Sequence, residues 1–476
     1  MIFNMTDTSG GGGGGSAVTV IDETLPNGST ARHITGVNIS DTTAVASDVA
    51  TGKVFYDADG TKTTGSASSV TVESLSVTTN GTYTAPTGKA YSPVTVNVSG
   101  GGGGEAEEKD VNFYDYDGTR VYSYTKADFL ALNAMPANPD HSGDDIPLTS
   151  QGWNWSLADA KTYVTSFTKL NIGQTYTPTD EKTHIVIEIP QGVPSAQLTY
   201  YVRCTPTVAT GVTIDWDDGN TTTTSSTSAT NYSHTYAAPG TYDITVKATS
   251  GTVSFVGAST NAIYGATANY WNRLRIRSVR FGKNVTVGNY AFYYCYNLQD
   301  VTVPSTVTLS GTNVFQYCYA LRHITIPSGV TSITNYLFAN CNTLETVSIP
   351  ASVTSIGNYG FDSCYELRSA QTPSNLTSLG EAAFNYNYKR EEILVPSGVT
   401  SISARAFANI YGVLSIHVLR YLPNDATPIT ALANTNAFSS VPSNINIVVP
   451  DAAVSSYKAA SYWSTYASRI IGESDV

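Results

Sequence analysis

The chain has 476 residues and a mass of 50.5 kDa, more than one hydrophobic core usually serves, so we expect several domains. Charged residues make up only 13%, the formal net charge is −12 and the pI is about 4.9. This acidic balance argues against the basic surface that a nucleic-acid partner requires, and no apolar run approaches the about 20 residues of a membrane-spanning helix. We therefore expect neither nucleic-acid binding nor membrane insertion.

Residues 1–16 form a flexible glycine-rich leader, and a second glycine run at 100–104 marks another spacer. The leader lacks the basic n-region and the apolar h-region of a secretory signal. A bacterial adhesin has to be exported, whereas a virion component is made and assembled inside the host cell. We therefore expect a virion component.

Two small β modules are expected before the second spacer, at 17–68 and, with the glycine linker, at 69–104. The stretches Ala46 to Ser68 (ASDVATGKVFYDADGTKTTGSAS) and Asn80 to Gly102 (NGTYTAPTGKAYSPVTVNVSGGG) resemble short modules of tail proteins from phages of gut bacteria. This resemblance implies a phage or prophage structural protein that attaches to the virion through 17–68.

Two D-x-D-G sequences, ending at Gly60 and Gly118, are compatible with calcium loops or with tight turns. A calcium loop needs a glutamate six residues after the glycine, but Ser66 and Tyr124 stand there. The sequences flanking each Asp-Gly pair predict strands, so we interpret both as hairpin turns.

Residues 105–178 predict a small α+β module. Helices are expected to begin at Thr125 and Ser156, because each is followed three residues later by an aspartate, as in a capping box. Trp153 and Trp155 are interpreted as core residues rather than as an exposed sugar-stacking pair.

Residues 179–258 alternate apolar and polar positions as strands do. The sequences IDWDDG and YSHTYAAPGTYDITV resemble the PKD domain, an Ig-like β-sandwich. The resemblance implies that Trp216 and Tyr242 are core aromatics and that the domain is a spacer. His234 is interpreted as a structural hydrogen-bonding residue.

The C-terminal part of the chain repeats every 23 residues. Phenylalanine recurs at this step, which predicts a solenoid of like units stacked on one another. The six repeat phenylalanines are Phe292, Phe315, Phe338, Phe361, Phe384 and Phe407.

A typical repeat unit is IPSGVTSITNYLFANCNTLETVS, from Ile326 to Ser348. It resembles the BspA-like class of leucine-rich repeat, whose pattern reappears at Phe361, Cys364, Leu367 and Pro373. The resemblance implies a leucine-rich-repeat solenoid over 259–450.

Four cysteines occupy one position of successive units, and a fifth, Cys204, lies in the sandwich. A 23-residue ladder does not give zinc-ligand spacing. A disulfide between adjacent turns is sterically conceivable, but buried free thiols are favoured. The column consists of Cys295, Cys318, Cys341 and Cys364.

Residues 451–476 predict a helical cap over the end of the solenoid. Val454, Tyr457 and Trp463 recur on one side at helical spacing, with Ala460 or Tyr462 between the last two. Asp451 is the expected N-cap.

Tyrosine, asparagine and serine fill most positions two before, two after and four after each repeat phenylalanine. Such residues give rigid contact area and adaptable hydrogen bonds, and aromatic faces also stack on sugar rings, so a glycan or a protein ligand is expected. The alternative is that tyrosine only tiles the repeat edges; a nucleic-acid stacking platform would need a basic groove. The candidate receptor-binding residues, here called the tyrosine belt, are Tyr290, Tyr293, Tyr294, Tyr296, Tyr317, Tyr319, Tyr336, Asn340, Asn342, Tyr359, Tyr365, Tyr386, Tyr388 and Tyr411.

No catalytic motif stands out. The six histidines are scattered over different modules, and neither glycine run has the setting of a phosphate loop. Paired carboxylates for glycoside cleavage remain an open alternative, because they can lie far apart in the chain. We expect no enzyme activity, no cofactor and no metal.

Together these patterns predict a mainly β, multidomain chain whose tyrosine belt binds a glycan or protein on a host bacterium. The expected setting is a phage tail fibre or tail tip, exposed on the virion, with other tail proteins as partners and a homo-oligomer, a trimer among the options. The alternatives are a bacterial surface adhesin with the same repeats and a purely architectural virion fibre or capsid decoration.

Overall fold

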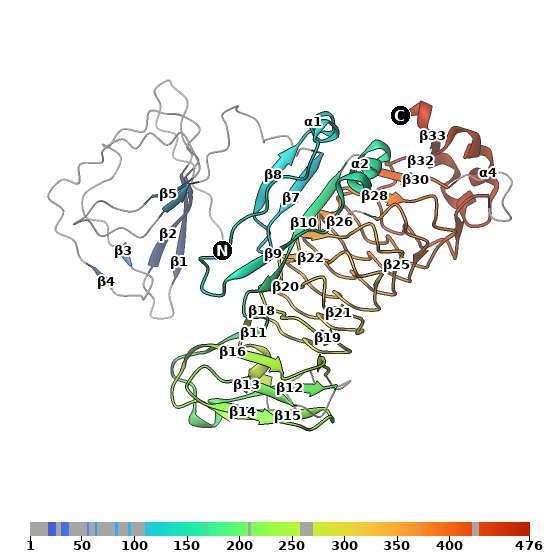
Figure 1. The fold of residues 1–476 in the computed structure, drawn as a ribbon. Coiled ribbons are helices and arrows are strands. Elements are labelled where there is room, and N and C mark those ends of the chain that lie inside the picture. The colour runs from blue at the N-terminus through green and yellow to red at the C-terminus, as the bar shows by residue number, and fades with distance from the viewer. Residues whose placement is uncertain are drawn as a thin grey trace, which may run out of the picture. The chain divides into compact units, whose positions relative to one another are not determined.

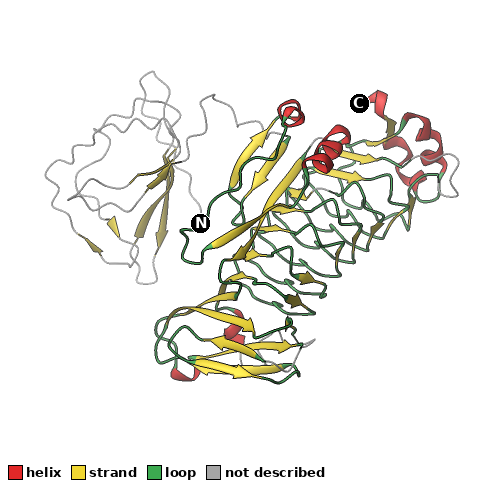
Figure 2. Ribbon diagram, viewed as in Figure 1, coloured by secondary structure: helices red, strands yellow, loops and turns green. Residues whose placement is uncertain are grey.

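The computed structural model describes residues 110–167, 169–207, 211–257, 270–370, 372–420 and 428–476, together with six short strands between residues 18 and 96 (Figure 1). The chain forms two compact units, Met1–Glu108 and Lys109–Val476. Figure 2 shows that strands and turns make up most of the second unit.

The described strands of the first unit pair as antiparallel hairpins. The turn expected at Asp57–Gly60 and both glycine runs lie outside the described residues. The pairs are β1 (Val18–Thr24) with β2 (Thr30–Val37), β3 (Phe55–Tyr56) with β4 (Lys62–Thr63), and β5 (Gly81–Tyr83) with β6 (Val94–Val96).

The second unit begins with a small sheet of order β8-β7-β10-β9 and two helices. Gly118, with φ +85°, makes the hairpin turn expected between β7 and β8. Both predicted helix starts are confirmed, because Thr125 accepts from the Asp128 amide and Ser156 from the Asp159 amide. The elements are β7 (Val111–Tyr114), β8 (Arg120–Tyr124), α1 (Lys126–Ala131), β9 (Leu148–Trp153), α2 (Leu157–Ser166) and β10 (Leu170–Pro178).

A β-sandwich follows, with Trp216 buried in its core and His234 stacked on Trp216 and bonded to Asp218. His234 therefore has the structural role expected of it. The elements are β11 (Thr183–Ile189), a 3₁₀ turn (Ser195–Gln197), β12 (Thr199–Pro206), β13 (Val212–Asp215), β14 (Thr221–Thr224), β15 (Thr230–Thr235), β16 (Gly240–Ala248) and β17 (Val253–Phe255).

Both sheets of the sandwich continue into the solenoid. β11 pairs with the first solenoid strand of one sheet, and β17 pairs with the first of the other. Strand edges that would otherwise be open at this end of the solenoid are thereby covered. The joining elements are α3 (Tyr270–Arg273), β18 (Ile276–Arg280), β19 (Val285–Val287), β20 (Asp300–Thr302) and β21 (Thr308–Leu309).

The following turns form parallel sheets on two sides of the solenoid. The first side holds β22 (His323–Thr325), β24 (Thr346–Ser348), β26 (Ser369–Ala370), β28 (Glu392–Val395), β30 (Ser415–Val418), β32 (Ile447–Val449) and β33 (Ile470–Gly472). The second side holds β23 (Ser332–Ile333), β25 (Ser355–Ile356), β27 (Ser378–Leu379), β29 (Ser401–Ile402) and β31 (Ala431–Leu432).

A column of stacked phenylalanine rings fills the solenoid. Successive rings from Phe292 to Phe438 lie 5.3 to 5.8 Å apart, all fully or almost fully buried. Phe281 meets the column at one end and Trp463 at the other. The predicted apolar interior is therefore confirmed.

The cysteines are free and buried, as predicted. Three thiols of the column also donate hydrogen bonds: Cys318 Sγ to the Phe292 carbonyl at 3.4 Å, Cys341 Sγ to the Phe315 carbonyl at 3.2 Å and Cys364 Sγ to the Phe338 carbonyl at 3.2 Å. Where the column changes, Nδ2 of Asn387 makes the equivalent bond to Phe361 at 2.8 Å.

The α+β module lies on the first side of the solenoid, where β10 crosses β20, β22 and β24 (Figure 1). Trp155 Nε1 donates to the Ile349 carbonyl at 3.0 Å, and the Tyr163 hydroxyl to the Thr372 carbonyl at 3.3 Å. This side of the solenoid is therefore covered along these turns, whereas the phenylalanine flank carries the tyrosine belt.

The C-terminal cap is present but is built from short pieces: 3₁₀ turns at Asp451–Ala453, Trp463–Arg469 and Glu473–Asp475, and α4 (Val454–Ala459). Tyr457 and Trp463 are buried, whereas Tyr462 is 46% exposed. The predicted N-cap role of Asp451 is wrong, because its carboxylate instead accepts from the amide and hydroxyl of Ser474. Within the described part of the chain, none of the helices has the length and apolar character that crossing a bilayer requires.

Candidate binding surface

The tyrosine belt lies on the flank that carries the repeat phenylalanines. Main-chain N–H groups at alternate residues of one turn donate to carbonyls of the next, as from Tyr290 to Thr312, Phe292 to Val314 and Tyr294 to Gln316, each at 2.9 Å. This ladder fixes the turns in register, so equivalent side chains of successive units lie beside one another.

Residues two before and two after the repeat phenylalanines adopt left-handed backbone conformations. The φ values are +57° at Tyr290, Tyr336 and Tyr359, +65° at Tyr294 and Tyr317, and +58° at Tyr386. Bulky residues adopt this region at a cost of about 1 kcal/mol or more, whereas asparagine enters it readily. Sequence reasoning missed this feature, although the asparagines in the same columns, at 313, 340 and 409, were a signal of it.

The belt tyrosines stack along the solenoid. Ring centroids lie 4.5 Å apart for Tyr294 and Tyr317, 4.9 Å for Tyr296 and Tyr319, and 4.8 Å for Tyr336 and Tyr359. A further stack joins Tyr365, Tyr388 and Tyr411 at 4.9 and 5.3 Å. A ring stacked on a neighbour offers a ligand its edge and hydroxyl more than its face, so these positions suit hydrogen bonding as well as contact area.

Ring contacts divide the belt tyrosines into three groups: an early cluster, the pair Tyr336 and Tyr359, and a later cluster. Tyr290 and Tyr293 join the stacks of the early units through ring contacts at 5.3 Å to each other and 4.1 Å from Tyr293 to Tyr294. Tyr386 contacts Tyr388 at 6.0 Å in the later cluster. Asn340 and Asn342 lie in the same unit as Tyr336, between the early and the later cluster.

None of the belt side chains is buried, and Tyr411 is 56% exposed. Partial burial, reinforced by neighbouring phenols, raises the pKa of Tyr293, Tyr317 and Tyr388. These hydroxyls therefore stay protonated at neutral pH and can donate hydrogen bonds.

No side-chain cluster suited to a metal ion occurs among the described residues. His141 is held between the carboxylates of Asp115 and Asp144, and His184 between those of Asp180 and Asp243. The ion pairs of His141 connect segments of the α+β module, those of His184 connect strands of the sandwich, and neither histidine belongs to the tyrosine belt.

Comparison with protein families assigns two parts of the chain. Residues 191–263 match the PKD domain, and residues 285–414 match the BspA type leucine rich repeat region in 6 copies. A search of curated proteins found no match.

Three solved leucine-rich-repeat structures are similar to part of the chain. They are a repeat protein of T. pallidum (25% identity, TM-score 0.27), a leucine rich cell surface protein of Faecalibacterium prausnitzii (21%, 0.23) and a repeat protein of Bacteroides ovatus (16%, 0.24). They align with 34%, 36% and 37% of this chain and with 67%, 62% and 66% of their own lengths. The chain thus spans about two thirds of each.

The resemblance of 46–68 and 80–102 to phage tail modules stays a prediction, because most of both segments lies outside the described residues. The two assignments made from the repeat and from the sandwich sequence are confirmed. This chain carries a PKD domain followed by a BspA-type leucine-rich repeat region.

Proposed function

We propose that the protein is a non-catalytic adhesion protein whose tyrosine belt binds a glycan or protein on a bacterial cell surface. The observation that carries this proposal is the set of tyrosines at left-handed backbone positions. Asparagine would stabilise these turns better, so a selected contact with a ligand accounts for bulky aromatic residues there. The regular step along the belt suits a repetitive ligand, because many weak contacts add up to avidity.

The second part of the proposal concerns whether the protein is part of a phage particle or of a bacterial cell surface. We propose a phage tail fibre or tail tip, in which several copies of the chain, as a trimer or another homo-oligomer, are exposed on the virion beside other tail proteins. This part rests on the tail-module resemblance of the first unit. Antibodies against the chain would label purified particles if it holds, and would label the bacterial surface in particle-free cultures if the protein is a cellular adhesin.

The belt is tested by replacing Tyr294, Tyr317 and Tyr386 together with asparagine. Asparagine already occupies the same column at 340 and 409 with φ of +62° and +56°, so the backbone is retained. We expect binding of the full chain to host cells to fall at least tenfold while the melting temperature changes by only a few degrees.

The matched control is Tyr462→Asn. Tyr462 also has a positive φ, +65°, and is 46% exposed, but it lies in the C-terminal cap. Binding should be unchanged in this variant. If the triple variant binds cells as well as the wild type does, the belt is only a tiled repeat edge and the protein is a scaffold.

A further inference from the structure

On the second side of the solenoid, the turn of β21 does not pair with the turn of β23. Main-chain bonds join later turns on the second side, as from Thr354 N to Thr331 O at 2.9 Å and from Thr377 N to Thr354 O at 2.8 Å. Among the described residues, the equivalent bond from Thr331 N to Thr308 O is not formed, and the sheet that ends at β21 does not continue into β23.

On the phenylalanine flank the same two turns stay joined. Phe315 N donates to Leu337 O at 3.0 Å, and Tyr317 N to Ala339 O at 2.9 Å. The turns are therefore held together on the phenylalanine flank, whereas on the second side the described residues join them only at the end of the gap, where Thr334 Oγ1 donates to the Gly311 carbonyl at 2.5 Å.

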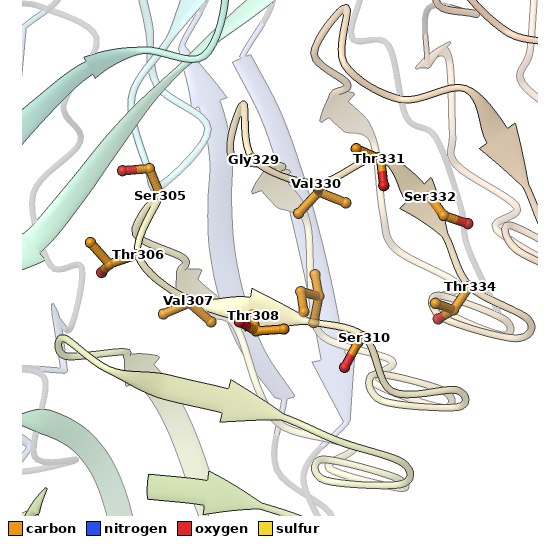
Figure 3. A pocket seen from close by; sticks show the side chains of 11 residues that line it. Ser305, Thr306, Val307, Thr308, Ser310, Gly329, Val330, Thr331, Ser332 and Thr334 are labelled. Atoms are coloured by element: carbon orange, nitrogen blue, oxygen red, sulfur yellow. The ribbon is translucent and has the colours of Figure 1, made fainter. Parts of the chain in front are cut away.

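A groove of about 330 Å³ lies at this opening, between the turn of β21 and the turn of β23 (Figure 3). Val307, Leu309 and Val330 line it with side chains that are almost buried, so its floor is apolar. The remaining lining residues are serine, threonine and glycine, with Thr308 and Thr331 exposed. No charged residue lines the groove.

Within the described residues, a side-chain bridge between turns is missing at the groove. In the next unit Ser352 Oγ donates to the Val330 carbonyl at 2.7 Å, and one unit later Asn375 Nδ2 donates to the Ala351 carbonyl at 3.1 Å. These side chains bridge neighbouring turns. The equivalent position in the groove is Gly329, which has no side chain to form the bridge.

We propose that this groove binds one sugar ring of an uncharged glycan. A pyranose has an apolar C–H face, which suits the valine and leucine floor, and hydroxyls around its edge, which suit the threonine and serine rim. The volume lies at the lower end of ligand pockets, about 300–1,000 Å³, so one ring fits rather than a long ligand. Recognition of a carboxylate, sulfate or phosphate would call for arginine or lysine, and the groove has neither.

The groove is separate from the tyrosine belt, because it lies where the turns part and the belt lies where they stay bonded. An extended peptide would instead pair with a strand edge. The edges available here, β21 and β23, are each 2 residues long, which is too short for that mode.

The test is titration calorimetry of the full chain with maltotriose, cellotriose and chitotriose, and with trigalacturonate as the charged comparison. At least one uncharged trisaccharide should bind, and trigalacturonate should not. Gly329→Ser should weaken binding at least tenfold, because the new hydroxyl can bridge to the Val307 carbonyl as Ser352 does to Val330. A Cβ at Gly329 meets only the Ser305 carbonyl, at 3.5 Å, so the fold tolerates the change.

Ala431→Ser is the matched control, since it adds a hydroxyl to β31 of the same side, four turns away, and should leave binding unchanged. Thr331→Val keeps the shape of the rim, removes one hydroxyl and should weaken binding severalfold. The triple asparagine variant of the belt should bind these sugars normally. The inference is overturned if none of the uncharged trisaccharides binds, if only trigalacturonate binds, or if Gly329→Ser binds as the wild type does.

Discussion

Asn154 Nδ2 donates to the main-chain carbonyl of Ile326 at 2.8 Å, although the two residues are 172 positions apart in the chain. The same nitrogen also reaches the Ser348 carbonyl at 3.2 Å, on the next turn. One amide therefore ties the α+β module to two successive turns of the solenoid.

Asn154→Ala should lower the free energy of unfolding by about 3 kcal/mol, because it removes several hydrogen bonds to buried groups. Besides the two carbonyls, the Gly173 amide and the Ser348 hydroxyl would lose the acceptor Oδ1. Urea denaturation measures the change. Asn375→Ala, which removes an exposed amide bonded to one carbonyl, is the control and should cost under about 1 kcal/mol. Equal losses would mean that the module is not fastened through Asn154.

Asn387→Cys should stabilise the protein by about 1 kcal/mol. Asn387 Oδ1 is buried without a hydrogen-bond partner, and a thiol would keep the bond to the Phe361 carbonyl that its neighbours in the column make. Asn387→Ala should act in the opposite direction, since it leaves that carbonyl unpaired. Chemical denaturation of both variants measures whether the free energy of unfolding rises or falls. If Asn387→Cys is destabilising, the Asn387 Oδ1 atom has a hydrogen-bond partner in solution.

Arg390→Leu should also stabilise the fold, by about 1–3 kcal/mol. Arg390 is 3% exposed and occupies the repeat position at which earlier units have leucine. Its Nε and Nη1 atoms are buried without hydrogen-bond partners. Burial lowers the pKa of Arg390 to about 10. Its guanidinium lies 4.3 Å from the centre of the Phe384 ring, which offsets part of the burial cost. Arg390→Ala is the contrast, because it leaves a cavity and should destabilise. A rise in melting temperature with leucine and a fall with alanine is the expected pair of results.

Acid should destabilise the protein through His323. This side chain is buried between Thr346 and Thr325, and burial lowers the pKa of His323 to about 4. Because the neutral form is favoured only in the folded state, the contribution to stability is complete above about pH 6.5 and is lost as the pH falls towards 4. The loss approaches about 1.4 kcal/mol for each pH unit within that window.

His323→Gln retains hydrogen-bonding groups but does not titrate. The difference in unfolding free energy between wild type and variant should therefore shrink from pH 7 to pH 4.5. Parallel pH profiles for the two proteins would contradict the assignment.

The repeat and its interior were predictable because their signals are local and periodic. Phe338 and Cys341 recur at a fixed step, and such a step forces equivalent residues to the same place in each turn. The helix N-caps at Thr125 and Ser156 were equally predictable, since a capping box spans only a few residues.

Contacts between residues that are far apart in the chain could not be predicted from the sequence. Nothing near Asn154 indicates that it meets Ile326. The missing pairing between β21 and β23 has no local signal, because Gly398 occupies the same repeat position as Gly329 and its strand β29 still pairs with β27. For Asp451 the local sequence was misleading. It suits a helix N-cap, but the carboxylate of Asp451 accepts a hydrogen bond from the amide of the distant Ser474 instead.

The sandwich closes the first turn of the solenoid, and Trp463 closes the last. The phenylalanine column is therefore covered by an aromatic ring at each end, Phe281 at the first turn and Trp463 at the last. Lengthening in evolution has to come from duplication of a 23-residue unit inside the stack, which would move Trp463 outward by one step and leave both closures intact.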